Sequence, residues 1–143
     1  MDKVSKWMKK ALTIEDNVSL IEAIHLMKEE NLRHLPVMHK EKLVGLLTEY
    51  SIQRSTPGKA TSLDTWELHY LLSKVPVKQA MITDPYTVSD NADIIEAVQL
   101  MHDKKLYGLC VINEQGNLAG ILTITDVLEA FLTISKEGRA AAQ

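Results

Sequence analysis

The sequence predicts a mixed α/β (α+β) fold, made of two β-α-β-β-α units packed as a pseudo-twofold pair with a helical insertion between them. The main observation is an internal repeat: segments 13–27 and 87–101 are identical at eight of fifteen positions, at an offset of 74. Both copies also pass from short strand-like runs to helical periodicity in the same order. Because each unit has only a few short strands, it cannot cover both faces of its own small sheet. The two copies are therefore expected to pack together.

The repeat sets the expected boundaries. The first copy is placed at residues 1–54, a helical strap at 55–76, the second copy at 77–134 and a flexible tail at 135–143. In each copy a short strand (12–14 or 86–88) precedes a helix that opens with a capping-box pattern, Ser19-x-x-Glu22 or Asp93-x-x-Glu96. Two strands follow, at 34–38 and 43–47 or at 108–112 and 118–122, and a second helix starts at Thr48 or Thr123.

The strap is predicted to contain a helix over 62–74, with four apolar residues near one face: Leu63, Trp66, Tyr70 and Leu71. One interpretation is a helix packed on its own module. The other is a contact with a second copy or a protein partner, because Trp and Tyr are favoured interface anchors.

Composition excludes several classes of function. The net charge of −3 and the absence of a basic cluster longer than Lys9-Lys10 argue against nucleic acid as the partner. No apolar run approaches the roughly 20 residues that cross a bilayer, and the start lacks the apolar stretch of a signal peptide, so we expect a cytoplasmic protein without membrane contact. The single cysteine, Cys110, lies in a strand-like apolar run and is expected to be a small buried hydrophobe.

The spacing of the histidines His25, His39, His69 and His102 is not that of a zinc site, so no metal is expected. No nucleophile–base order or glycine-rich phosphate loop is recognisable either, and the chain is not expected to be an enzyme.

The start of the second helix in the second copy is the most informative segment. Thr123, Thr125 and Asp126 are expected at a helix N-terminus, where free N–H groups and the helix dipole attract phosphate. An ionised carboxylate is an acceptor that suits the two hydroxyls of a ribose. The same Thr-x-x-Asp spacing can equally be a capping box that only satisfies backbone donors. Spacing alone leaves both interpretations open.

The pattern Gly-hydrophobic-x-Thr-x-x-Asp, carried by Gly120, Thr123 and Asp126, together with Leu35-Pro36-Val37, resembles the CBS motif named after cystathionine β-synthase. The resemblance covers roughly residues 4–54 and 77–132. It implies a Bateman module that binds AMP, ADP, ATP or S-adenosylmethionine and that dimerises into a four-motif disc. The strap also resembles that of the acetoin-utilisation branch of CBS proteins.

The resemblance implies a role for each matching residue. Asp126 would bind ribose and the two threonines phosphate, while the adenine side would be formed by two segments: Thr83, Tyr86, Thr87 and Val88, then Gly108, Leu109 and Cys110. A weaker second site in the first copy would use Thr13, Pro36, Thr48 and Ser51.

The first copy departs from the pattern, because Ser51 stands where the acid should be and Glu49 adds negative charge. A charge-assisted hydrogen bond is worth about 1.5–3 kcal/mol, so this site is expected to be about ten- to a hundred-fold weaker or empty. Arg33 and His34 are candidate phosphate partners; the alternative is a solvated pair at a strand edge. If His34 binds phosphate, affinity should fall as pH rises. These features favour one composite site over two equal ones.

The leading hypothesis is therefore a regulatory nucleotide sensor that needs no cofactor and acts through dimer or partner geometry. The competing hypothesis is a dimerisation or interaction module with vestigial sites, which Ser51 favours and Asp126 disfavours.

Overall fold

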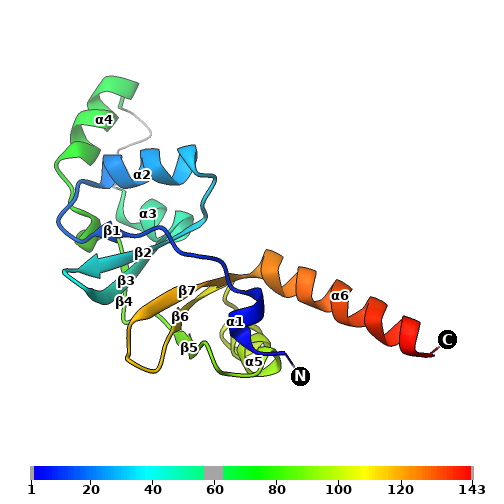
Figure 1. The fold of residues 1–143 in the computed structure, drawn as a ribbon. Coiled ribbons are helices and arrows are strands. Elements are labelled where there is room, and N and C mark those ends of the chain that lie inside the picture. Colours follow the sequence, from blue (N-terminus) through cyan, green and yellow to red (C-terminus); the bar gives the residue numbers. More distant parts are fainter. Residues whose placement is uncertain (1, 57–62, 143) are drawn as a thin grey trace. The chain divides into compact units, whose positions relative to one another are not determined.

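The computed structural model describes residues 2–56 and 63–142 and shows a mixed α+β fold (Figure 1). Its contacts divide the chain into two compact units. The first-copy unit is residues 12–85, and the second-copy unit is residues 1–11 with 86–143. Within the described ranges, no helix combines the length and apolar character needed to cross a bilayer.

The first-copy unit contains a sheet in the order β1-β2-β3-β4. β1 is parallel to β2 because α2 forms the crossover between them, whereas β2 and β3 form an antiparallel hairpin and β4 lies antiparallel to β3. The elements are β1 (Ile14–Glu15), α2 (Leu20–Glu29), β2 (His34–His39), β3 (Lys42–Thr48), α3 (Glu49–Ser55), α4 (Thr65–Ser73), the 3-10 turn η2 (Val77–Gln79) and β4 (Ile82–Thr83).

The second-copy unit repeats the pattern with a three-stranded sheet in the order β5-β6-β7. β5 is parallel to β6 across α5, and β6 and β7 form an antiparallel hairpin. The elements are α1 (Val4–Trp7), β5 (Thr87–Ser89), α5 (Ile94–Lys104), β6 (Gly108–Ile112), β7 (Leu118–Thr123) and α6 (Ile124–Ala142). Each predicted strand and helix is present, and the first strand of each copy lies one or two residues later than expected.

Side-chain caps start the helices where the sequence places them. The Ser19 hydroxyl accepts from the Glu22 amide at 3.4 Å, and the Asp93 carboxylate accepts from the Ile95 amide at 2.8 Å. The periodic apolar residues of α2 and α5 then enter separate cores. Ile95, in the first turn of α5, is an exception, because it is 52% exposed.

Each copy's leading segment, residues 2–9 for the first copy and 75–83 for the second, packs on the body of the other copy. Val4 N–H donates to the Ala92 carbonyl at 2.9 Å in the second-copy unit, and Val77 N–H donates to the Val18 carbonyl at 2.8 Å in the first-copy unit. Residues 1–11 therefore belong to the compact unit of the second copy, although sequence order places them at the head of the first.

The close approach of these segments explains one glycine in each copy. A Cβ on Gly120 would lie 2.6 Å from the Lys9 carbonyl oxygen, and a Cβ on Gly45 would lie 2.9 Å from the Ile82 carbonyl oxygen. Both distances are shorter than a Cβ contact allows, so glycine is required for the leading segment to pair with β7 or β3.

The strap helix α4 differs from its prediction in the face that it buries. Leu72 is 8% exposed and Leu68 packs beside it against the first-copy core, next to α2, whereas Trp66 and Tyr70 are 80% and 61% exposed. The helix thus packs on its own module through the opposite face from the one proposed. Both faces carry apolar residues, so periodicity could not choose between them. Residue 62, the first residue of the predicted strap helix, lies outside the described residues.

The helix α6 continues through the segment expected to be a flexible tail and ends at Ala142 (Figure 1). Lys136, Glu137, Arg139 and the alanines that follow are good helix formers, and Gly138 is the single weak position among them.

The glycine constraint can be tested by substitution. We expect Gly120→Ala to lower the free energy of unfolding by about 1–3 kcal/mol, because the new methyl group meets the Lys9 backbone rather than a side chain that can move. Gly138→Ala is the matched control: its added Cβ has no heavy atom within 4 Å, and it should leave stability unchanged or slightly raised. Urea denaturation measures both, and equal effects would contradict this account.

Candidate functional site

The start of α6 places the carboxylate of Asp126 back against its own helix terminus. Asp126 Oδ2 accepts from the Thr123 amide at 2.8 Å and from the Thr123 hydroxyl at 3.1 Å. The residue is only 3% exposed. The capping interpretation of Thr-x-x-Asp is therefore realised, and the single proton of the Thr123 hydroxyl is directed to the carboxylate.

The other carboxylate oxygen faces a cation from the leading segment. Lys9 Nζ lies 3.2 Å from Asp126 Oδ1 and 3.5 Å from Glu129 Oε2. The hydrogen bond with Asp126 raises the pKa of Lys9, with desolvation acting against it, so the ammonium remains charged at neutral pH. A buried carboxylate needs such a partner, since an uncompensated charge is costly to bury.

The backbone amides at this terminus are already partly used. Ile124 N–H donates to the Tyr107 carbonyl at 2.9 Å, and the Thr123 amide is taken by Asp126. Thr125 is exposed. Of the two threonines predicted to hold phosphate, Thr125 thus has the more accessible hydroxyl.

The equivalent terminus in the first copy is a complete capping box. The Ser51 amide donates to Thr48 Oγ1 at 3.0 Å, and the Thr48 amide donates to Ser51 Oγ at 2.9 Å. The Ser51 hydroxyl donates in turn to the Thr48 carbonyl at 3.0 Å, and the residue is fully buried. Its donor is therefore used inside the helix terminus. Of the other first-copy candidates, Thr13 is exposed ahead of β1 and Pro36 is buried in β2 opposite Leu46.

The second-copy sheet brings several predicted residues together. Cys110 lies opposite Thr87, and Gly108 lies opposite Thr123. Val88 is buried, and Leu109 and Cys110 are fully buried core side chains, so only the backbone of these last two could face a ligand. Burial raises the pKa of the Cys110 thiol to about 12, which keeps it protonated.

Three of the residues predicted for the main site belong to the first-copy unit. Thr83 lies in β4 opposite Gly45, and His34 opens β2 opposite Thr48. Arg33 is exposed beside it. The residues proposed for one composite site thus come from both compact units.

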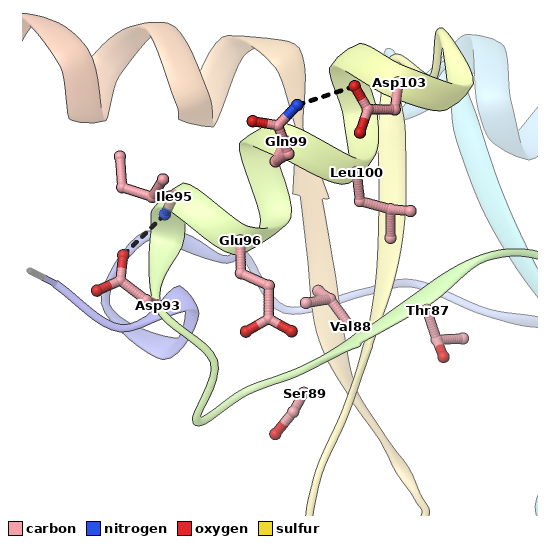
Figure 2. A pocket seen from close by; sticks show the side chains of 9 residues that line it. All are labelled: Thr87, Val88, Ser89, Asp93, Ile95, Glu96, Gln99, Leu100 and Asp103. Atoms are coloured by element: carbon pink, nitrogen blue, oxygen red, sulfur yellow. Dashed lines mark hydrogen bonds between the residues drawn. The ribbon is translucent and has the colours of Figure 1, made fainter.

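A groove that sequence reasoning missed lies between β5 and α5 and has a volume of about 810 Å³. In Figure 2 the Glu96 side chain points from α5 toward β5, and Asp93 and Asp103 lie toward opposite ends of the groove. Its carboxylates oppose phosphate binding. The groove includes Thr87 and Val88 but neither Thr123 nor Asp126, and the spacing of Asp93, Glu96 and Asp103 along one helix was the available signal. Among the described residues, no group of three or more His, Cys, Asp or Glu could hold a metal ion.

Comparison with known proteins gives a consistent result. The family model described as the CBS domain matches residues 4–57 and 77–133. The chloroplastic CBS domain-containing protein CBSX2 of Arabidopsis thaliana is 30% identical over 142 aligned residues, covering 87% of this chain and 60% of that protein. An inosine-5'-monophosphate dehydrogenase of Thermoplasma acidophilum is 27% identical over 81% of this chain, which spans only 21% of that protein.

Solved structures share the fold. CBSX2 in complex with AMP has a TM-score of 0.77 at 27% identity, covering 94% of this chain and 99% of that one. A Vibrio cholerae protein assigned to acetoin utilization, AcuB, has a TM-score of 0.79 at 24% identity, covering 98% and 97% of the two chains.

The pKa of His34 gives a pH prediction. Burial, and then the charge of Arg33, lowers the pKa of His34 below its ordinary value of 6.5. Near pH 6 the unfolded chain therefore binds more protons at His34 than the folded chain does. The free energy of unfolding consequently decreases as pH falls through 6.5. We expect the melting temperature of the wild type to fall more between pH 7.5 and 5.5 than that of His34→Gln. Parallel pH profiles would contradict this assignment. The same shift moves any phosphate contact of a charged His34 to acidic pH.

Proposed function

Because the chain belongs to the CBS domain family, we propose that it is a regulatory module that binds an adenosine compound and is not itself an enzyme. The ligand class is AMP, ADP, ATP or S-adenosylmethionine. The observation that carries the proposal is the buried Asp126 carboxylate at the start of α6, whose Oδ1 faces a side chain that can move rather than its own helix.

Three features support a ligand at this position. The acid lies at the N-terminus of a 19-residue helix, where the helix dipole favours phosphate. Thr125 offers an accessible hydroxyl one residue away. CBSX2, which shares the fold at 27% identity, was crystallised with AMP. Sensing would further require different ligand affinities in two states of the module.

The first copy supplies the test of the ribose acid. Ser51 forms a complete capping box with Thr48, so Asp126→Ser is expected to keep the helix cap while removing the charged acceptor. We expect calorimetric titration with AMP, ADP, ATP and S-adenosylmethionine to show a roughly ten- to a hundred-fold loss of affinity in Asp126→Ser for the ligand that binds the wild type.

The charge-matched control is Glu114→Gln, which removes one exposed carboxylate from the turn between β6 and β7 of the same unit. It should leave affinity within about twofold, because an exposed charge is largely screened. No binding to the wild type at millimolar ligand would refute the sensor and favour the interaction-module alternative. Full binding to Asp126→Ser would refute the site.

Homodimerisation is the second part of the proposal. The outer face of α6 carries Leu128, Phe131 and Leu132, each 56–66% exposed and spaced to form one stripe. A stripe of this kind is typical of a helix that packs against another helix.

Substitution on this stripe should therefore separate the protomers. We expect Phe131→Glu to convert a dimer to a monomer in sedimentation velocity experiments, because the new carboxylate would be buried without a partner. Trp66→Ser, on the exposed face of α4, is the control and should leave the mass unchanged. Dissociation by Trp66→Ser alone would place the interface on the strap instead.

A further inference from the structure

Lys9, in the segment paired with β7, is a charged side chain that reaches the candidate ribose acid from a distant part of the sequence. Given the proposed function, on which this inference rests, we propose that Lys9 determines which adenosine compounds the site accepts. Its ammonium is bound to Asp126 in this structure; a ribose has to replace it there, and the released cation then favours a ligand that carries negative charge over a neutral or cationic one.

The backbone of Lys9 is fixed while its ammonium remains accessible. Lys9 and Ile121 exchange two backbone hydrogen bonds of 2.9 Å, and the absence of a side chain on Gly120 allows this approach. The Lys9 side chain is nevertheless 62% exposed. Its ammonium can therefore leave the carboxylate without disturbing the strand pairing.

A count of acceptor positions shows why the ammonium and a ribose compete. A carboxylate offers about four lone-pair positions. Thr123 uses two on Oδ2, and Lys9 uses one on Oδ1. Two ribose hydroxyls need two positions, so the ammonium has to move. Glu129, 3.5 Å from Lys9 Nζ, would keep the cation beside the site.

Comparison of the two copies shows that the cation accompanies the acid. Lys9 pairs with Ile121 on β7, and Ile82 pairs with Leu46 on β3, one residue after Gly120 and Gly45 respectively. Ile82 is therefore the counterpart of Lys9, as Ser51 is of Asp126. The copy with a neutral serine has an apolar residue, and the copy with a buried acid has a cation.

Capping does not require this cation. Ser51 and Thr48 close the first-copy terminus with neutral groups alone. Lys9 is thus tied to the charge of Asp126 and not to the helix start, which makes it a residue of the ligand-facing side of the carboxylate.

The test compares adenosine, ADP and S-adenosylmethionine, which share a ribose and differ in charge. In the wild type we expect ADP to bind more tightly than the other two. Lys9→Met should reduce the preference for ADP over adenosine by about tenfold, the effect of one unit charge at a half-exposed site, and should strengthen S-adenosylmethionine relative to ADP. Titration calorimetry measures all three affinities.

Two variants serve as controls. Lys10→Met removes the same charge from the adjacent exposed residue and should change the preference by less than about twofold, because salt screens exposed charges. Lys9→Arg keeps the charge and should retain the wild-type preference. If Lys9→Met does not fold, Lys9→Gln is used instead, with circular dichroism and the unfolding midpoint as the check.

The outcomes separate this inference from the proposed function. Ligand binding with the same preference in wild type and Lys9→Met would overturn the role of Lys9 and leave the proposed function standing. An equal change for all three compounds would assign Lys9 a structural role only and would also overturn the inference. Failure of the wild type to bind any of the three would overturn both.

Discussion

The structure depends on an exchange of leading segments between the two repeats. Residues 2–9 complete the second-copy sheet and residues 75–83 complete the first-copy sheet, through equivalent backbone hydrogen bonds and at equivalent glycines. A short sheet gains a further paired edge in this way, which satisfies backbone groups that would otherwise be exposed. The second-copy unit is consequently formed from two separate pieces of chain, residues 1–11 and 86–143, whereas the first-copy unit is the continuous segment 12–85.

This exchange also brings together the charges at the candidate site. Asp126 is buried with its Oδ2 capping α6, and that burial makes a counter-charge necessary. Lys9, in the segment that pairs with β7, provides this counter-charge. The Asp126 side chain thus caps the helix through Oδ2 and remains available to an exchangeable partner through Oδ1. Structural and ligand-binding interpretations of the motif are therefore compatible, since they use different atoms.

Divergence between the copies follows the same logic. Replacement of the acid by Ser51 leaves the helix cap intact, because a hydroxyl can both donate and accept within the terminus. A copy can accordingly lose its charged acceptor with little effect on its fold. The cores remain alike while the chemistry at the helix starts differs, which is the arrangement expected when one copy keeps a ligand site and the other keeps mainly a structural role.

The sequence by itself determined the repeat, the order of strands and helices, the capped helix starts and the position of Asp126, because these depend on residues close together along the chain. Tertiary structure alone decided three further points. It assigned each leading segment to the other copy's sheet, and it selected Leu68 and Leu72 over Trp66 and Tyr70 as the buried face of α4. It also paired Lys9 with Asp126. Contacts between distant segments depend on the path of the folded chain, and a short helix with apolar residues on both faces has no periodicity that shows which face is buried.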